Sequence, residues 1–543
     1  MSQPADKPPG LQASDLRALN RRALVGAVGA ALAGPAFGQT TDQGGQQKPA
    51  TPPGLQAVVP KGYSERFIKV REMIAAGRYD EAVERFEQPP KPEPAPKGAK
   101  GDPKPASSGP KPPPPIVSDA YLADTEMGLL AFEGGHVEDA VGHLHDAEDI
   151  HEGVGAPTTR SAAVKKGFGG AARLLAGKLT GQEEIEVYHP LDHEVILLLN
   201  YLALARLLQG ERECYNVTRR CIDQQTDLKA KFDKEIEAYK SKYSEQTSDT
   251  TKVTDTDRTS LGNLSDQFKS YDTAATRVPN AYVNPLGDYL AGVIQEIVSR
   301  EEPALRDNAK IAYQTAARLC GGSPQLAAAA AAMARPRVPP KERVLHVVAG
   351  EGFAPERDVM TFGLAFHGDV VLVKVPIFKP VPSAVSRIAV QAPSGQILAT
   401  LDPIGDFEAI RLRDQHDRIP EIMLGVLTSF LASYFEGRLM DKLGLAGQVL
   451  HLVRDAAATP DTRSWLSLPR RFHVARVVLP PKVTSSVNMV SFDAAGRRIA
   501  SQPVTLLAGE TQSFVYARAT DQGLQAQAAR RLWIDGKLEE TAA

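Results

Sequence analysis

Cysteine is scarce in this sequence, and its scarcity excludes two classes of small folded domain. The 543 residues include three cysteines, Cys214, Cys221 and Cys320, too few for a disulfide-dense scaffold or a four-cysteine zinc site. Cys214 and Cys221 are seven positions apart on a predicted helix, about 10.5 Å along its axis. That is beyond the ~7 Å between Cα atoms that a disulfide tolerates. Buried thiols are the expected state, and one pair that includes Cys320 stays open.

Net charge is also nearly absent. The sequence has 63 Lys+Arg against 65 Asp+Glu, a formal net charge of -2. This balance excludes a strongly basic nucleic-acid binder and a strongly acidic tail protein, so no nucleic-acid partner is expected. Hydrophobic residues make up 42% of the chain, enough for most of it to bury a core. The length predicts about two to four domains.

Long apolar runs are missing as well, and the N-terminal one is short. Arg21 and Arg22 precede an uncharged stretch, Ala23–Gly38, that is too short and too rich in Gly and Ala to span a bilayer stably. The paired arginines and mild apolar core resemble a bacterial twin-arginine export signal. Asn20 stands where Ser or Thr is usual, so general secretory export stays open. A disordered N-terminus with a chance apolar run is the other alternative.

Small residues mark where such a signal would be cleaved. Ala36 and Gly38 occupy the -3 and -1 positions of a cleavage site, which predicts a signal peptide over residues 1–38 with cleavage after Gly38. No cysteine lies near this site, which excludes a lipid anchor there. We therefore expect a soluble periplasmic protein with no transmembrane span after cleavage.

Helical periodicity dominates the first half of the chain, after a Gln/Gly/Pro-rich stretch at 39–60 that predicts a disordered spacer. Two segments share the spacing of a turn glycine followed by residues that pack between paired helices. These residues are Gly77, Tyr79, Ala82 and Phe86, and then Gly135, Val137, Ala140 and Leu144. The spacing resembles tetratricopeptide (TPR) repeats, and it predicts a TPR-like α-solenoid over residues 61–335.

Two insertions interrupt the predicted solenoid. Residues 89–115 are dense in proline with interspersed lysine, which predicts an exposed, stiff, disordered loop. A proline-rich ligand for a partner is the alternative there. Residues 244–260 are rich in Ser, Thr and Asp and predict a second disordered loop.

After Pro340 the period changes from helix to strand. Short β-branched-rich segments between Gly, Pro and Asp turns predict strands at 343–349, 370–378, 385–392, 396–401, 471–479, 487–492, 498–506 and 512–517. The fold class is therefore α+β: a TPR-like solenoid, then a β-rich domain over 341–520 and a C-terminal tail over 521–543. A helical insertion is expected at 407–453. Its uncharged stretch Ile422–Phe435 predicts a helix buried against the sheet, with a membrane-lying helix as the alternative.

Several segments are similar to a group of functionally uncharacterised bacterial envelope proteins. They are Asp461–Pro469, Val474–Pro481, Leu197–Leu204, Asn284–Gly292, Gly352–Pro355 and Val375–Pro380. Members of that group have a TPR-like helical N-terminal half and a β-rich C-terminal half, and many are lipoproteins. The resemblance covers roughly residues 121–517. Because the lipobox cysteine of that group is missing from this chain, the resemblance implies a soluble periplasmic form. Members are often encoded beside an outer-membrane lipoprotein activator of peptidoglycan synthases, which implies a link to peptidoglycan synthesis.

Candidate metal and nucleotide sites are weak. His136, His143, His145 and His151 lie among acidic residues and are suitable zinc ligands, but no HExxH pattern accompanies them. We therefore interpret them as a solvated helix face, with a metal site as the alternative. Residues 172–179 resemble a phosphate loop superficially but lack its first glycine and its final hydroxyl residue. No catalytic residue, cofactor or metal is predicted.

Asp461, Arg463 and Trp465 form the most specific local motif. One interpretation is a recognition patch that makes arginine–aromatic stacking available to a partner. The other is a structural role, in which Asp461 pairs with Arg463 beside a buried Trp465 and fixes the chain between the helical insertion and the next strand. We favour the structural role.

These observations favour a non-catalytic periplasmic scaffold or adaptor that binds other envelope proteins. Stacked helix pairs would offer a groove over residues 121–320 to a partner. The alternative is an enzyme that acts on envelope glycans or peptides, or a ligand-binding module, with a pocket in the β-rich domain. Such an enzyme needs carboxylates that converge in a cleft.

Overall fold

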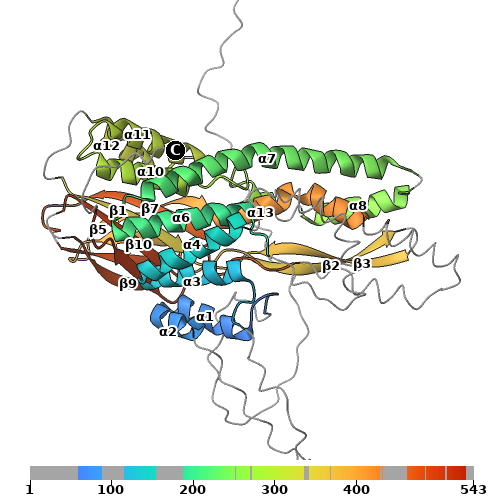
Figure 1. Cartoon of the computed structure of the whole chain (residues 1–543), viewed down its shortest axis with the longest axis horizontal. Helices are drawn as coiled ribbons and strands as arrows, with labels where there is room; N and C mark the ends of the chain where they lie inside the picture. Colours follow the sequence, from blue (N-terminus) through green and yellow to red (C-terminus); the bar gives the residue numbers. More distant parts are fainter. Residues whose placement is uncertain are drawn as a thin grey trace, which may run out of the picture. The chain divides into compact units, whose positions relative to one another are not determined.

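The structure is a computed structural model. It describes residues 59–87, 115–153, 188–250, 252–268, 272–335, 342–366, 369–428, 431, 461–483, 485–507 and 510–532. The predicted signal peptide with Arg21 and Arg22, the phosphate-loop-like segment and all but the last residue of the proline-rich insertion lie outside these ranges. Within them, no helix has the length and apolar character needed to cross a bilayer. The fold is α+β (Figure 1).

The helices of the described residues come mostly in consecutive, packed pairs. They are α1 Glu65–Ala75, α2 Tyr79–Glu87, α3 Ala120–Gly134, α4 Val137–Gly153, α6 Asp192–Gln209, α7 Cys214–Ser248, α8 Asp255–Gln267, α9 Asp272–Ala275, α10 Pro285–Val298, α11 Leu305–Leu319, α12 Pro324–Ala334 and α13 Phe407–Asp417. Asp119 caps α3 by accepting from the Leu122 N–H, and Gly135 ends it with φ 88°, a conformation that favours glycine. The predicted turn glycines Gly77 and Gly135 are confirmed.

The strands form three sheets. They are β1 Val344–Glu351, β2 Glu356–Phe366, β3 Asp369–Lys379, β4 Arg387–Gln391, β5 Ile397–Thr400, β6 Asp402–Asp406, β7 Arg471–Val478, β8 Ser486–Phe492, β9 Arg498–Thr505, β10 Gln512–Ala519 and β11 Leu524–Ala528. One sheet has the order β11-β10-β1-β7-β6, a second the order β5-β4-β8-β9, and β2 pairs only with β3. β1 runs parallel to β10, and the other pairs are antiparallel.

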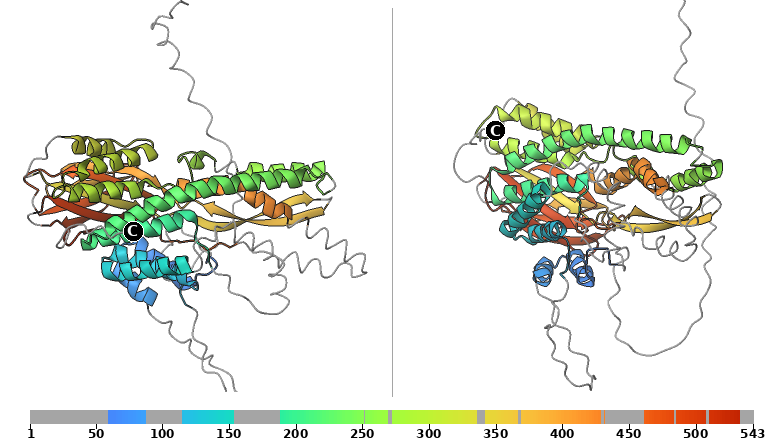
Figure 2. Two further views of the ribbon diagram at one scale, coloured as in Figure 1. Left: turned by 45° about the horizontal axis from the view of Figure 1, so that its top comes forward. Right: turned by 45° about the vertical axis from the view of Figure 1, so that its right-hand side comes forward.

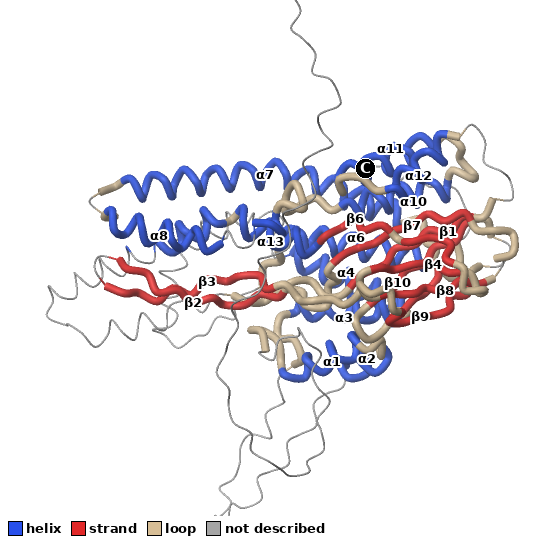
Figure 3. The backbone as a smooth tube through the Cα atoms, turned by 180° about the vertical axis from the view of Figure 1, so that it is seen from behind, coloured by secondary structure: helices blue, strands red, loops and turns tan. Residues whose placement is uncertain are grey.

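The five-stranded sheet is buried on both faces, which produces three layers (Figure 3). Leu345 and Val347 of β1 pack in one core with Met489 of β8, on the side of the four-stranded sheet. Val348 of β1 and Tyr516 of β10 belong to the other core, which contains the helices. Because alternate side chains enter opposite cores, β1 and β10 are buried along their whole length.

The predicted separation into a helical domain and a β-rich domain is wrong. The described residues all belong to one compact unit, Thr51–Ala543. The physical reason is the shared core, in which residues of α3, α6 and α10 pack with residues of β1, β7 and β10. On the helix-facing side of the five-stranded sheet, neither the helices nor the strands have a separate core.

The predicted disordered loop at 244–260 is also wrong. Helix α7 continues to Ser248 and α8 begins at Asp255, so a short turn joins them. Thr254 and Asp257 form a capping box, which uses the side chains that suggested a loop. Val253 and Leu261 are buried, so this region also contributes to a core.

That core belongs to an arm, which we define as β2, β3, α8, the helical residues 419–428 and α7 near Tyr243. Figures 1 and 2 show β2 and β3 reaching away from the other strands, with α8 and the end of α7 beside them. Its buried residues are Val253, Leu261, Leu264, Phe268, Phe362, Leu364, Val373, Val375, Ile377, Met423, Val426 and Leu427. The predicted burial of the uncharged stretch against a sheet is confirmed for Met423 and Leu427, and the sheet is the β2–β3 pair. Residues 429–430 and 432–453 of the predicted insertion lie outside the described ranges.

The C-terminal tail predicted from residue 521 is wrong in its first part. Leu524–Ala528 form β11, which pairs antiparallel with β10. Ala526 and Ala529 are buried, which explains why the chain continues as a strand there. Residues 533–543 lie outside the described ranges.

Candidate functional site

Residues 461–469, which we call the junction segment, lie between the helices and the sheet. Buried side chains from distant elements bind its backbone. The Trp465 N–H donates to Glu194 Oε1 of α6 at 3.0 Å, and Arg411 Nη2 of α13 donates to the Trp465 carbonyl oxygen at 3.0 Å. Arg411 also donates to Glu194 at 3.0 Å, and both side chains are fully buried. Helix α6, helix α13 and the junction segment therefore meet at the backbone of one residue, Trp465.

Glu126 of α3 holds the next part of the junction segment. Its carboxylate accepts from the Leu466 N–H at 2.7 Å, the Ser467 N–H at 3.3 Å and the Tyr63 hydroxyl at 2.8 Å. Burial raises the pKa of Glu126, and the hydrogen bonds from Ser467, Leu466 and Tyr63 only partly offset it. Glu126 thus binds main-chain groups that have no strand partner.

Asp461, Arg463 and Trp465 lie together at the start of the junction segment. Arg463 Nη2 donates to Asp461 Oδ2 at 2.6 Å, and Arg463 Nη1 lies 3.6 Å from Asp119 Oδ2. Burial acts to raise the pKa of Asp461, but its hydrogen bonds with Arg463 outweigh burial and lower it. Trp465 is 0% exposed and its ring centroid lies 6.0 Å from that of Tyr201. The Arg463 guanidinium also lies 5.3 Å from the centroid of the Tyr188 ring. The structural role of the motif stays a prediction.

Two further buried carboxylates join the helices to the sheet. Glu133 of α3 accepts from Arg518 Nη1 of β10 at 2.8 Å and from the Tyr516 hydroxyl at 2.9 Å. Glu296 of α10 accepts from Arg476 Nη2 of β7 at 2.6 Å and from the Tyr313 hydroxyl at 2.8 Å. Burial raises the pKa of Glu133 despite the charge of Arg518. Sequence reasoning missed these glutamates, although a charged residue inside an otherwise apolar helix was the available signal.

The helix face that points to the sheet is occupied. Phe132 of α3 and Tyr201 of α6 lie 4.6 and 6.4 Å from Tyr516 of β10 between ring centroids. Tyr289 of α10 donates to the Ala475 carbonyl oxygen of β7 at 3.2 Å. The groove expected over residues 121–320 is therefore filled on this side by the chain's own sheet.

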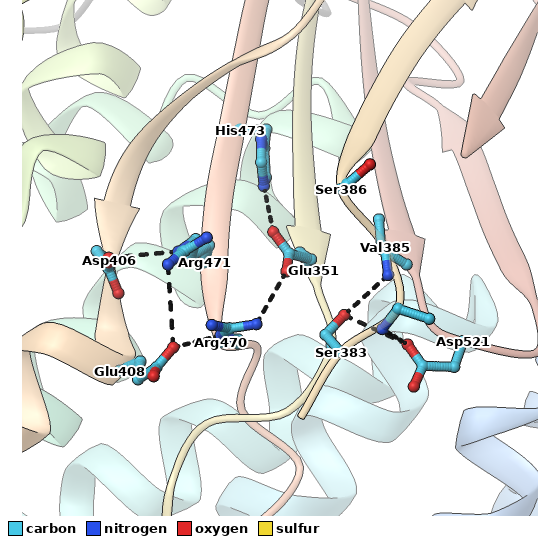
Figure 4. Close-up of polar contacts among 12 residues, drawn as sticks. Glu351, Ser383, Val385, Ser386, Asp406, Glu408, Arg470, Arg471, His473 and Asp521 are labelled. Atoms are coloured by element: carbon cyan, nitrogen blue, oxygen red, sulfur yellow. Dashed lines mark hydrogen bonds and ion pairs between the residues drawn. The ribbon is translucent and has the colours of Figure 1, made fainter. Parts of the chain in front are cut away.

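A second polar cluster lies at the ends of β1 and β7 (Figure 4). His473 Nε2 lies 2.7 Å from Glu351 Oε2, and Arg470 lies between Glu351 and Glu408. Arg471 pairs with Asp406 at 3.3 Å. Burial acts to raise the pKa of Glu351, but the hydrogen bond and charge of His473 outweigh it and lower the pKa. A general acid at neutral pH needs a raised pKa, and that of Glu351 is lowered. Glu351 is therefore suited to pair with His473 and Arg470 rather than to donate a proton.

The four histidines of the predicted cluster have different surroundings. Three contact separate carboxylates: His136 Nε2 and Asp80 at 3.1 Å, His143 Nδ1 and Asp124 at 3.0 Å, and His145 Nδ1 and Glu148 at 3.3 Å. Burial lowers the pKa of His151. The four do not converge on one point. Asp124, His143 and Asp146 do converge, and Asp124 was not among the residues singled out in the sequence.

Cys214, Cys221 and Cys320 are all free thiols, and the first two are buried as expected. Burial raises the pKa of Cys214 and of Cys221, so both stay protonated at neutral pH.

Comparison of the chain with protein-family models, with curated proteins and with solved structures finds no match.

Proposed function

We propose that this chain is a non-catalytic scaffold or adaptor of the periplasm that binds other envelope proteins, with TPR-like helix pairs as its helical layer. Support comes from how its buried charges are used. Glu194, Glu133 and Glu296 pair with arginines of the C-terminal half, so these charges hold one layer on another. These buried ion pairs connect the two layers into a rigid body that can present a binding surface.

The main support for the proposal is the arm, because its strand edges are not used by the buried ion pairs that hold the helices on the C-terminal half. Within the described residues β2 pairs only with β3, so each strand has one edge without a strand partner. An unpaired edge accepts an extended segment of another protein through main-chain hydrogen bonds. Two strands alone are marginally stable in water, and the arm's own core supports them. We therefore place the partner on the arm rather than in the groove over 121–320.

Site-specific photocrosslinking tests this placement. A photoreactive residue at Thr361, exposed on β2, should give a discrete adduct in cells that export the protein. Ser501, exposed on the edge strand β9, is the matched control and should give none. Adducts at Ser501 but not at Thr361 would place the partner elsewhere.

The periplasmic location rests on the N-terminal sequence. Exchange of Arg21 and Arg22 for lysine should leave precursor in the cytoplasm if export uses the twin-arginine route. Unchanged periplasmic levels would favour general secretory export or no signal.

The link to peptidoglycan synthesis predicts a cellular phenotype. Deletion of the gene should alter sensitivity to cell-wall antibiotics or detergent. Wild-type behaviour of the deletion strain, together with hydrolysis of a glycan or peptide by the purified protein, would favour the enzyme alternative.

A further inference from the structure

The hairpin of α3 and α4 brings one histidine and two aspartates together. Asp124 of α3 and His143 and Asp146 of α4 each offer one ligand atom, and these atoms lie within 4.8 Å of one another. His143 Nδ1 lies 3.0 Å from Asp124 Oδ1. Asp124 and His143 are partly buried and Asp146 is exposed, so the group opens to solvent on one side.

A close approach of the two helices explains this convergence. A Cβ atom on Gly128 of α3 would lie 2.9 Å from Leu144 Cδ2 of α4, so the glycine is what allows the helices to pack this closely. Asp124 precedes Gly128 by about one turn, and His143 is next to Leu144. Asp146 follows His143 by three positions and therefore shares its side of α4.

We propose that Asp124, His143 and Asp146 bind a divalent transition-metal ion of the zinc type. An imidazole nitrogen and carboxylate oxygens are ligands that zinc uses in proteins. Bonds of about 2.1 Å in a tetrahedral site place ligand atoms about 3.4 Å apart. The ligand atoms of the three residues lie within 4.8 Å of one another, so small side-chain rotations bring them to that distance. The solvent-facing side leaves room for water to complete the coordination.

Without a metal, the same geometry is an ion pair between His143 and Asp124. The hydrogen bond that His143 donates to the Asp124 carboxylate raises the pKa of His143 against the opposing effect of burial, and the charges of Asp124, Asp146 and Asp139 add to this rise. His136, in the turn between α3 and α4, and Asp80 of α2 form a comparable pair at 3.1 Å. No third ligand joins that pair among the described residues, so it provides a control for simple pairing.

Titration of the purified, chelator-treated full chain with Zn²⁺ tests the site by calorimetry, and Co²⁺ provides a visible ligand-field band. We expect saturable binding and a thermal midpoint that rises with added Zn²⁺. Both should be lost in His143→Ala and in Asp124→Asn and kept in His136→Ala. Circular dichroism shows whether each variant is folded.

Three results would overturn the proposal. They are a wild-type chain that shows no saturable binding, binding of wild-type strength in a folded His143→Ala, and equal loss in His136→Ala. Asp146→Asn gives a second, exposed substitution that does not disturb helix packing, and it should also lose the binding. The proposal is independent of the partner on the arm, since the two lie on different elements.

Discussion

Arg518 and Glu133 illustrate how single residues hold the layers together. Both side chains are almost completely buried, at 0% and 1% exposure, and they pair at 2.8 Å. Arg518 also donates to the carbonyl oxygens of Gly352 and Ser467 at 2.6 and 2.8 Å. The energetic value of such a pair lies less in its net attraction than in the cost of leaving one charge alone.

We predict that Arg518→Met destabilises the chain by about 3–5 kcal/mol, because Glu133 then remains buried without its cation. The double variant Arg518→Met/Glu133→Gln should recover part of this loss, since no buried charge remains. Arg497, 83% exposed and paired with Asp493 at 2.8 Å, is the control, and Arg497→Met should change stability little. Denaturant unfolding of the four proteins measures these effects. A double variant that is no more stable than Arg518→Met would contradict the coupling.

His193 predicts a dependence of stability on acidity. It is buried and accepts from Arg411 Nε at 3.3 Å. Burial and the charge of Arg411 lower its pKa to about 4, against the opposing charges of Glu194 and Asp414. The unfolded chain takes up this proton near pH 6.5, whereas the folded chain does so only near pH 4. Stability should therefore fall as pH drops through this window, by up to about 3 kcal/mol.

The measurement is the free energy of unfolding at pH 7, 5.5 and 4.5 for the wild type and His193→Gln. Glutamine keeps an acceptor for Arg411 but does not titrate. The free energy of unfolding of His193→Gln should therefore depend less on pH than that of the wild type, because the contribution of His193 is missing. Parallel profiles would show that the proton is not excluded from His193 in the folded chain.

At the scale of elements, the α3–α4 hairpin depends on one glycine. Gly128→Ala places a Cβ atom 2.9 Å from Leu144 Cδ2 and Cγ, so the helices must move apart or Leu144 must shift. We predict a loss of about 1–3 kcal/mol from overpacking. Gly142 of α4 is exposed with nothing within 4 Å of its would-be Cβ, and Gly142→Ala should stabilise by about 0.5–1 kcal/mol. Thermal unfolding compares the two, and equal effects would contradict the packing argument.

Some elements were predictable because local signals and burial agree. The turn glycines and the strands near 343–349, 471–479 and 512–517 were identified from the sequence. β2 was missed because it begins with three charged residues and contains Gly363, and both features weaken a strand signal. The start of α8 was missed because Thr254 and Asp257, which cap the helix, have the composition of a loop.

The polar junction was less predictable for a different reason. The pairing of Asp461 with Arg463 is local, and the sequence suggested it. The hydrogen bonds that the Trp465 and Leu466 N–H groups donate to Glu194 and Glu126 span 271 and 340 positions. No periodicity carries such information, because the partners are chosen by the packing of one layer on another. Buried glutamates in apolar helices could be found, but their arginines could not.

At the scale of the whole described molecule, the helices and the five-stranded sheet share a core. Tyr201 of α6 contacts Trp465 of the junction segment and Phe472 of β7. The sheet needs the helices for the same reason, since Phe514 and Tyr516 of β10 face them. Each half would therefore expose a large apolar face in the absence of the other.

We predict that residues 59–335 and residues 342–532, expressed separately, do not fold independently. Each fragment would expose the face that the other covers, and Glu133, Glu194 and Glu296 would lose their arginines. Each should lack a cooperative thermal transition by circular dichroism. Co-expression should restore a soluble complex, which controls for the chain break itself. A cooperative transition in either fragment alone would mean that the shared core is not required, and that the two halves are separate domains.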